Sequence, residues 1–272
     1  MTAQGYFKYL KAQARPYKYA ELLASIKAIL AEDIFNNTYG RQRMYEKLVL
    51  DYACPYCQKT VEKAMREHGL LQKKKRNPKG LTKSDKQAQK SDNLINRDFT
   101  ADAPNKKTVT DIVEFQASDG KVYTSALFDC FDNACLGLSM ASHMRAELVV
   151  ETVEQAAAMY DLRGTITHSY RGSQYTSEAF RKAIAKLKIV QSMNSAAGRC
   201  HDNAKCESMW GRGKVEILAC YDTKNMTCDE LKSVIFYFYM VYWNHRRICS
   251  AIGGIPPMVK RGACYERLAD AA

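Results

Sequence analysis

Apolar residues recur at helical spacing in the first quarter of the chain. Leucines and isoleucines fall three and four positions apart between Leu22 and Leu30, which predicts a helix with one buried side. A second helix is predicted after Gly40, where the sequence reads TYGRQRMYEKL, and a third over residues 58–68, which a glycine follows. Residues 1–71 are therefore predicted to form a region of short helices.

The pattern changes to strands in the middle of the chain. β-rich runs occupy residues 108–115, 122–129 and 135–141, and a Ser-Asp-Gly-Lys turn joins the first two. A helix is predicted over residues 146–160, and a short strand follows at 165–168. A meander of three strands followed by alternating helix and strand predicts a mixed α/β sheet with helices on both sides.

A compact block of motifs follows, which reads HSYRGSQYTS and, after a helix that Ser177 opens, DNAKCES. Asp202 or Asn203 can cap the N-terminus of a further helix. That helix carries Glu207 and Lys214, which lie two turns apart and so share one face. A strand end, a turn and a helix with a carboxylate in so short a block favour a binding or catalytic site.

The last predicted helix is rich in aromatic residues, FYFYMVYWNHRR, and a Gly-Gly-Ile-Pro-Pro run ends it. Phe236, Tyr239 and Trp243 are three and four residues apart, which favours a buried stripe over a surface that stacks on bases. Arg246 and Arg247 follow this stripe at the helix end, where they could reach a DNA backbone.

Basic residues exceed acidic ones, 41 against 29, which gives a formal net charge of +12. A surplus of this size fits a polyanion such as nucleic acid, and the alternative is ordinary solvated charge. Residues 72–90 read QKKKRNPKGLTKSDKQAQK and cannot bury a core, so residues 72–103 are predicted to be a basic linker that follows phosphates. Its candidate phosphate contacts are Lys73, Lys74, Lys75 and Arg76.

Membrane and metal signals are weak in this sequence. The chain has no run of about 18 apolar residues and no apolar signal core, so a cytoplasmic location is predicted. Ten cysteines without a secretory signal favour reduced thiols. Cys54 and Cys57 form one CxxC, but no second pair follows at zinc-finger spacing. Cys200, His201 and Cys206 are interpreted as a small buried cluster rather than a metal site.

The motifs HSYRGSQYTS, DNAKCES and KVE, with Thr-Asp-Ile around Asp111, resemble those of insertion-sequence DDE transposases of the OrfB type, the integrase-core family of two-reading-frame elements. That family has HSDxGSQYTS, DNAxxES and KxE in the same order. The resemblance covers residues from about 35–260. It implies a ribonuclease H-like integrase core over residues 104–262, preceded by a helix-turn-helix-like region at 1–71 and followed by a tail at 263–272.

The resemblance also implies a chemistry. In the family, three acids hold two Mg²⁺ (or Mn²⁺) ions that promote phosphodiester cleavage and strand transfer at the element's ends. Asp111 matches the first acid and Glu207 the third, so both are expected catalytic residues and metal ligands. The second position holds Tyr170, whose phenol is uncharged at neutral pH, and so we expect impaired catalysis. Asp161 and Asp202 are nearby acids, but neither occupies the family's position.

DNA, a homo-oligomer on paired ends and an OrfA-type partner or fusion are the partners that the resemblance implies, in a bacterial cytoplasm where the DNA-bound protein joins the nucleoid. The helix-turn-helix-like region would bring basic residues to DNA, with a plain structural bundle as the alternative. Those residues are Arg41, Arg43, Lys47, Lys59 and Lys63. The other candidate DNA contacts outside the linker are Arg171, Lys214, Arg246 and Arg247.

Three hypotheses compete for the function: an impaired DDE transposase, a catalytically inactive DNA-bound remnant or regulator, and a tyrosine recombinase. In the last, Tyr170 would be the nucleophile, with His168, Arg171, Arg199 and His201 as helpers. Gly213 lies inside a predicted helix, where glycine costs about 1 kcal/mol relative to alanine. Together with Tyr170, it is interpreted as a sign of a decayed or altered copy.

Overall fold

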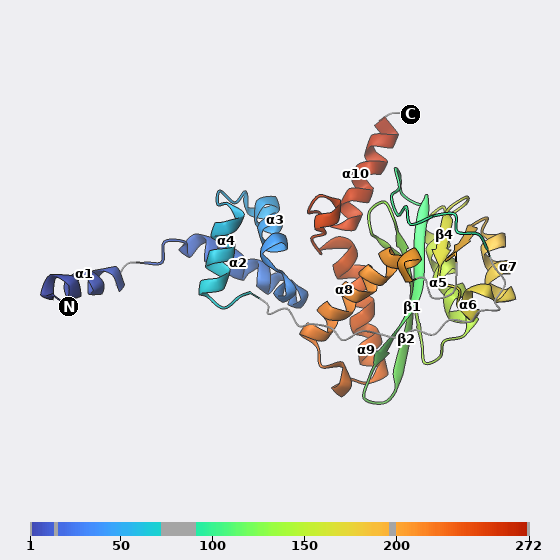
Figure 1. The fold of residues 1–272 in the computed structure, drawn as a ribbon, viewed down its shortest axis with the longest axis horizontal. Helices are drawn as coiled ribbons and strands as arrows, with labels where there is room; N and C mark the ends of the chain where they lie inside the picture. The colour runs from blue at the N-terminus through green and yellow to red at the C-terminus, as the bar shows by residue number, and fades with distance from the viewer. Residues whose placement is uncertain (1, 14–15, 72–90, 196–199, 271–272) are drawn as a thin grey trace. The chain divides into compact units, whose positions relative to one another are not determined.

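The computed structural model describes residues 2–13, 16–71, 91–195 and 200–270. The chain divides into two compact units, Met1–Lys74 and Lys75–Ala272 (Figure 1). Among the described residues, no helix is long and apolar enough to cross a bilayer.

Short helices build the first unit, as predicted. They are α1 (Ala3–Gln13), α2 (Ala20–Glu32), the 3₁₀ turn η1 (Ile34–Thr38), α3 (Arg41–Tyr52) and α4 (Gln58–Glu67). Helices α2, α3 and α4 contact one another, because each turns its apolar stripe inward. The buried stripes consist of Leu22, Ile26, Ile29, Met44, Leu48, Val61, Ala64 and Met65.

A five-stranded mixed sheet forms the centre of the second unit, in the order β3-β2-β1-β4-β5. The first three strands make the predicted antiparallel meander, and β4 and β5 add to β1 in parallel. The strands are β1 (Lys107–Gln116), β2 (Lys121–Asp129), β3 (Cys135–Ala141), β4 (Ile166–Ser169) and β5 (Val190–Met193).

Helices cover both faces of this sheet, so the predicted architecture is confirmed (Figure 1). On one side lie α5 (Ala146–Met159), α6 (Ser173–Thr176) and α7 (Glu178–Lys186), whose apolar residues form a common core with the sheet. On the other side lie α8 (Ala204–Cys220), α9 (Cys228–Phe236) and the π-helix η4 (Tyr237–Trp243). Short 3₁₀ turns and the last helix complete the unit: η2 (Cys200–Asn203), η3 (Thr223–Asn225), η5 (Ser250–Ile252) and α10 (Pro257–Asp270).

Two predicted boundaries need correction. Residues 91–103 were assigned to a linker, but Asp92 accepts a backbone hydrogen bond from Met193 in β5 at 3.1 Å, and Ile95 is buried. Residues 263–270, predicted as a tail, continue helix α10. That helix is held to the sheet because Arg261 forms buried ion pairs with two acids, Asp129 and Asp132. The basic run 72–90 lies outside the described residues.

The aromatic segment packs largely as predicted. Tyr239 and Trp243 are buried in a cluster with Phe128 and Trp210, in which ring centroids lie 5.1 to 6.3 Å apart. Phe236 is the exception, because it is 51% exposed at the end of α9. The π-helix begins at the next residue and widens the turn that presents these rings to the sheet.

Gly213 has a packing role that its sequence context did not reveal. A Cβ atom at Gly213 would lie 1.9 Å from the hydroxyl of Tyr239 and 2.6 Å from its ring carbon Cζ. The ring of Tyr239 therefore occupies the space that any other residue would need. The interpretation of Gly213 as a sign of decay is therefore corrected: the contact between α8 and η4 requires glycine at this position.

Replacing Gly213 by alanine is expected to destabilise the protein by about 2 kcal/mol, because overpacking outweighs the gain in helix propensity. Gly211 is the matched control in the same helix, since a Cβ there meets nothing within 4 Å. Gly211→Ala should stabilise the protein by up to about 1 kcal/mol. Urea unfolding of both variants measures the difference.

The hydroxyl of Tyr239 is buried without a hydrogen-bond partner among the described residues. Adding Tyr239→Phe to Gly213→Ala removes the nearest clashing atom and should recover part of the lost stability. Equal effects of alanine at positions 211 and 213 would contradict the packing role.

Candidate active site

The site begins where strands β1 and β4 run side by side. In their parallel register Thr110 pairs with Ser169, and the buried hydroxyls of Thr108 and Thr167 lie 2.8 Å apart across the pair. The next residues along the two strands are Asp111 and Tyr170. Asp111 lies in the middle of β1 and Tyr170 directly after β4, so both follow the last pair of the β1–β4 ladder.

Helix α8 brings Glu207 to the same edge. The amine of Lys205 donates to the carbonyl of Cys130 at 2.8 Å, and that of Lys214 donates to the carbonyl of Glu114 at 2.9 Å. Cys130 is hydrogen-bonded to the start of β1, whereas Glu114 is near its end. Helix α8 is thus fixed along β1 on both sides of Glu207, which lies in its first turn.

Asp111 and Glu207 interact electrostatically. The pKa of Asp111 is raised to about 6, mainly because the carboxyl is buried; the hydrogen bond from the N–H of Ile112 lowers the pKa, and the negative charge of Glu207 raises it. Asp111 is half-buried and Glu207 is exposed, so the pair faces solvent on one side. Two carboxylates that repel each other in this way favour the binding of a proton or a cation.

His168 is a structural residue rather than an exposed base. Its ring is fully buried, with Nδ1 2.8 Å from the hydroxyl of Ser192 and Nε2 2.9 Å from Oδ1 of Asn194. Burial lowers its pKa, which keeps the ring neutral. The ring therefore joins the ends of β4 and β5 and supports the backbone that leads into Tyr170, which is half-buried.

The carboxylate of Asp202 is occupied by hydrogen bonds that hold the loop before α8. It is 1% exposed and accepts hydrogen bonds from Arg97 at 2.8 Å and from the backbone N–H of Ser195 at 3.0 Å. Burial raises the pKa of Asp202, but these hydrogen bonds outweigh it and hold the pKa at about 2. This carboxylate therefore stabilises the loop and does not replace the missing acid beside Asp111.

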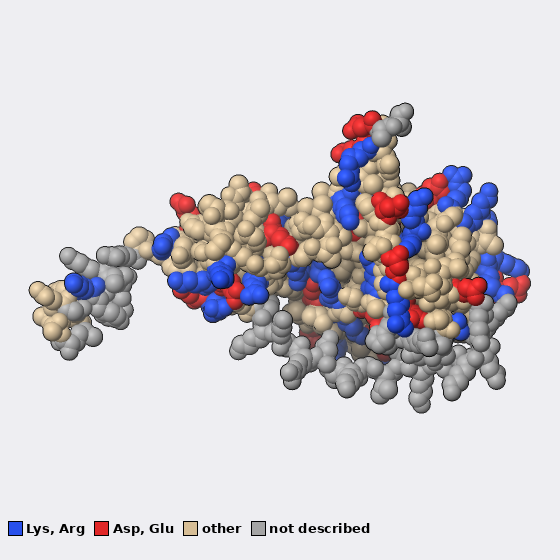
Figure 2. Space-filling view, turned by 45° about the horizontal axis from the view of Figure 1, so that its top comes forward, with Lys and Arg blue, Asp and Glu red and all other residues tan. Residues whose placement is uncertain are grey.

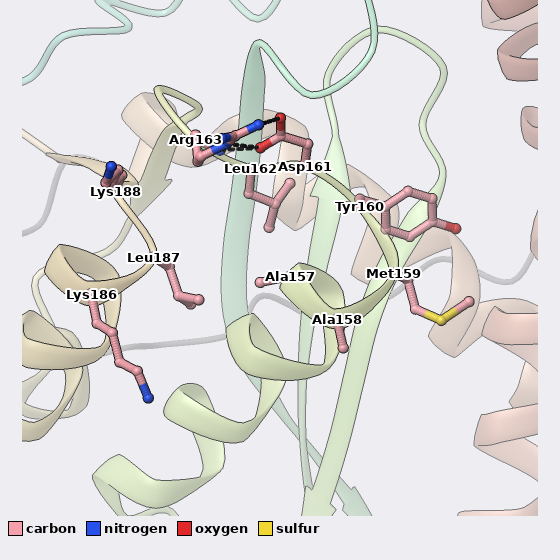
Figure 3. Close-up of a pocket in the computed structure, with 10 residues that line it drawn as sticks. All are labelled: Ala157, Ala158, Met159, Tyr160, Asp161, Leu162, Arg163, Lys186, Leu187 and Lys188. Carbon is pink, nitrogen blue, oxygen red and sulfur yellow. Dashed lines mark hydrogen bonds and ion pairs between the residues drawn. The ribbon is translucent and has the colours of Figure 1, made fainter.

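Asp161 lies before β4, at the end of the strand opposite to Tyr170. Figure 3 shows it at an open surface pocket, where its two oxygens face the guanidinium of Arg163 at 2.6 and 2.8 Å. The hydrogen bonds from Arg163 lower the pKa of Asp161 to about 2. This acid belongs to a separate surface feature.

Two arginines predicted to contact DNA are buried, and these predictions are corrected. Arg171 is 8% exposed and donates to the carbonyl of Ser195 at 2.9 Å. Arg247 is 3% exposed and forms a two-point ion pair with Glu216, at 2.6 and 2.9 Å. Both guanidiniums hold the protein together, whereas Arg246 next to them is exposed.

The basic residues of the first unit are only partly available. Arg41 is exposed but paired with Glu62 at 2.9 Å, and Arg43 donates to the carbonyl of Thr38 at 3.0 Å. Lys47 is paired with Asp51. Lys59 and Lys63 are exposed, and Lys63 lies 3.8 Å from a carboxylate oxygen of Glu67. Figure 2 shows Lys and Arg over the visible surface of both units, with acids between them. The linker residues 73–76, Arg199 and the side chain of His201 lie outside the description.

No group of three or more His, Cys, Asp or Glu side chains arranged to hold a metal ion occurs within the described part of the chain. Asp111 and Glu207 make a pair only. The cysteines described there are free thiols. Within the CxxC, Cys57 contacts the hydroxyl of Thr60 at 3.5 Å and Cys54 faces the carbonyl of Tyr56.

Asn203 is a site residue whose role the sequence did not indicate. It precedes α8, but it does not cap the helix with its side chain. Its Nδ2 donates instead to the carbonyl of Thr110 at 3.2 Å, directly before Asp111. The signal in the sequence was its spacing, four residues before Glu207, which places both on one side of the helix start.

Asp111→Asn is expected to stabilise the protein at pH 8 by about 1–2 kcal/mol and to leave it unchanged at pH 4. The pKa of Asp111 is raised to about 6, so the folded state holds a proton that the unfolded chain releases near pH 4. Stability is therefore lost as pH rises from about 4 to 6 and stays lower above that range. Urea unfolding across this range measures the effect.

Asp202→Asn is the control with the opposite sign. The pKa of Asp202 is lowered to about 2, so its stabilisation is present at neutral pH and is lost as pH falls through that value. The variant should be less stable than the parent at pH 7. A gain for Asp111→Asn as large at pH 4 as at pH 8 would contradict the assigned electrostatics.

Comparison with known proteins adds independent findings. The integrase core domain model matches residues 101–200, and the HTH-like domain model matches residues 18–79. A chain of the simian T-cell lymphotropic virus intasome superimposes with a TM-score of 0.52 at 15% identity, over 79% of this chain and 73% of that one. At such low identity this likeness shows a shared fold alone.

Relatives found by sequence are more similar to this chain. A transposase-like protein of Haemophilus influenzae is 36% identical over 168 residues, which cover 62% of this chain and 76% of that protein. The transposase InsF of insertion sequence IS3A from Escherichia coli is 30% identical over 221 residues, 80% of this chain and 75% of InsF. A probable transposase of IS1353 from Shigella flexneri is 30% identical over 95% of this chain, which spans about half (49%) of that relative's length. The chain belongs to the insertion-sequence transposases with an integrase core domain.

Proposed function

We propose that the edge formed by Asp111, Tyr170 and Glu207 is a divalent-cation site for phosphodiester cleavage and strand transfer at insertion-sequence ends, and that Tyr170 impairs it. DNA transposition is the function of the family. The observation that supports the proposal is the register of β1 and β4, whose last pair, Thr110 with Ser169, directly precedes Asp111 and Tyr170. A carboxylate at that position would complete a set of three acids with Glu207.

The residues at this edge fit a hard cation such as Mg²⁺ or Mn²⁺. Asp111 and Glu207 supply carboxylate oxygens, and the buried Oδ1 of Asn203 has no hydrogen-bond donor among the described residues. Oxygen ligands of this kind are those that Mg²⁺ prefers, together with water and substrate phosphate. When bound, two such ions would activate the attacking hydroxyl and stabilise the leaving oxygen of the phosphodiester.

Each residue has a defined part in this proposal. Asp111 binds the cation and gives up its proton on binding, since its pKa of about 6 leaves part of the apo protein protonated near neutral pH. Glu207, held by α8, supplies the second carboxylate. Tyr170 fills the third position without a charge. Loss of that charge costs several kcal/mol of transition-state stabilisation, roughly a thousandfold in rate.

DNA would reach the site over exposed cations. Arg246 is exposed at the end of the aromatic segment, and Lys214 is half-exposed along α8, with its amine also bonded to the carbonyl of Glu114. Arg41, Lys59 and Lys63 would supply contacts on the helix-turn-helix-like unit, since exposed cations next to phosphates release counterions. Oligomerisation on paired ends, an OrfA-type partner and a helix-turn-helix-like region that ends at residue 71 are part of this proposal.

A second function, a catalytically inactive DNA-bound regulator of transposition, has its own supporting observation. The surroundings of Tyr170 are intact: His168 and Asp202 keep buried hydrogen bonds on either side of it. A chain that keeps its fold and its basic surface while losing one acid can still occupy DNA ends or join an active copy.

Two of the four helpers in the tyrosine recombinase hypothesis, His168 and Arg171, are committed to other contacts. A nucleophilic tyrosine needs a neighbouring base and exposed cations for the phosphate. His168 is buried and neutral, and the guanidinium of Arg171 is bound to Ser195. We therefore expect no covalent adduct between Tyr170 and DNA, which a denaturing gel of the protein with labelled element ends would reveal.

Restoring the missing acid is the direct test of the proposed site. Tyr170→Asp should raise strand cleavage and joining on DNA with the element's ends by about a thousandfold in Mg²⁺ or Mn²⁺. Adding Glu207→Gln or Asp111→Asn to Tyr170→Asp should abolish that activity, because each removes a carboxylate of the same set. Tyr170→Phe is the matched control and should stay at the level of the parent.

Two outcomes would contradict the proposal that the protein is an impaired transposase. A parent chain as active as Tyr170→Asp would mean that another group fills the second position. A Tyr170→Asp variant that binds element ends but neither cleaves nor joins them would favour the regulator.

A further inference from the structure

The side chain of Asn203 is buried and bonded to the residue before Asp111, and its oxygen makes no hydrogen bond among the described residues. Asn203 is 1% exposed, and no donor among the described residues reaches its Oδ1. A buried amide oxygen without a partner costs about 1–3 kcal/mol, so such atoms call for an explanation. Its position next to Asp111 supplies one.

The orientation of this amide is fixed by chemistry. Nδ2 faces the carbonyl of Thr110 at 3.2 Å, and only the amide nitrogen can donate to a carbonyl. Strand β4 ends at Ser169, the register partner of Thr110, so the amide of Asn203 serves a β1 carbonyl where the paired strand ends. The side chain is therefore held beside the middle of β1, where the pairing with β4 ends, with its oxygen directed away from that carbonyl.

Asn203 is also tied to the second acid. It immediately precedes α8, and Glu207 follows four residues later, which is the spacing of side chains on one face of a helix. Asn203 thus touches the backbone next to Asp111 with its nitrogen and lies one helical turn below Glu207. Its oxygen, which has no partner among the described residues, thus belongs to a side chain that contacts the residue before Asp111 and precedes Glu207 by one helical turn.

We propose that Asn203 is a third member of the cation site, with Oδ1 as a neutral oxygen donor to a divalent cation held by Asp111 and Glu207. This inference rests on the proposed function. Neutral amide oxygens accompany carboxylates around hard cations, and a cation would satisfy the buried oxygen that the protein alone leaves unpaired. The residue offers an oxygen at a site that has lost the carboxylate of its second acid.

Titration of the full chain with Mn²⁺ alone, without DNA, tests this assignment. Electron paramagnetic resonance counts the free Mn²⁺ and gives its dissociation constant independently of activity. Asn203→Ala should weaken Mn²⁺ binding by about tenfold, as expected for the loss of one supporting donor. Asn203→Asp keeps an oxygen and adds a charge, so it should bind Mn²⁺ at least as tightly as the parent.

Asn244→Ala is the matched control for buried asparagines. Asn244 is 1% exposed, and its amide makes two hydrogen bonds of 2.9 Å with the backbone of Cys135, far in sequence from the acids. Its loss should lower the melting temperature without changing Mn²⁺ affinity. If Asn203→Ala proved too unstable to titrate, Asn203→Asp would still test the proposal. If the amide of Asn203 were only structural, Asn203→Asp would bind Mn²⁺ more weakly than the parent; if Asn203 is a ligand, the Mn²⁺ affinity would be kept or increased.

The outcomes separate this inference from the function on which it rests. Unchanged Mn²⁺ affinity in Asp111→Asn and Glu207→Gln would overturn the cation site itself. A loss of affinity in those two variants, with none in Asn203→Ala, would overturn the role of Asn203 alone. Weaker binding in both Asn203→Ala and Asn203→Asp would assign the residue to structure only.

Discussion

The parallel pairing of β1 with β4 is the constraint on which the rest of the site depends. It sets Thr110 opposite Ser169, the residues directly before Asp111 and Tyr170, which are 59 positions apart in the chain. A slip of one residue would turn Asp111 to the other face of the sheet, because side chains alternate along a strand. The buried Thr108–Thr167 contact and the His168 hydrogen bonds hold this register from both sides.

Helix α8 has to lie along β1 for Glu207 to reach Asp111, and packing on its far side allows this. The missing side chain of Gly213 leaves room for the ring of Tyr239, and the buried Glu216–Arg247 pair joins the helix to the end of the aromatic segment. A buried ion pair adds little net stability, but breaking one is costly, so it favours a single arrangement. The residues that orient the acid thus lie about two turns or more beyond it along α8.

Much of this could be predicted from the sequence. Alternation and helical spacing indicated the strands and helices of both units, and the ordered motifs identified Asp111, Tyr170 and Glu207. Side-chain partners could not be predicted in this way. Nothing in a local pattern shows that Arg247 faces Glu216, because the two are far apart in sequence and only the fold brings them together.

The same limit explains the other differences. Gly213 is unfavourable by helix propensity, and only a tertiary contact overrides that preference. Asn203 fits the local pattern of a helix cap, yet its amide serves a strand carbonyl instead. Residues 91–103 are polar like a linker but contribute Ile95 to the core. Local sequence patterns predicted the helices, the strands and the positions of the motifs. The roles of individual side chains depended on burial and on contacts between residues far apart in the sequence.

Anomalous diffraction from crystals of the full chain soaked in Mn²⁺ tests the central claim most directly, because it locates the cation without any assay of activity. The account predicts a manganese peak bound by the carboxylates of Asp111 and Glu207, with the phenol of Tyr170 outside the ligand set. A peak at Asp202 or Asp161, or full soaking without a peak at the Asp111–Glu207 edge, would contradict it.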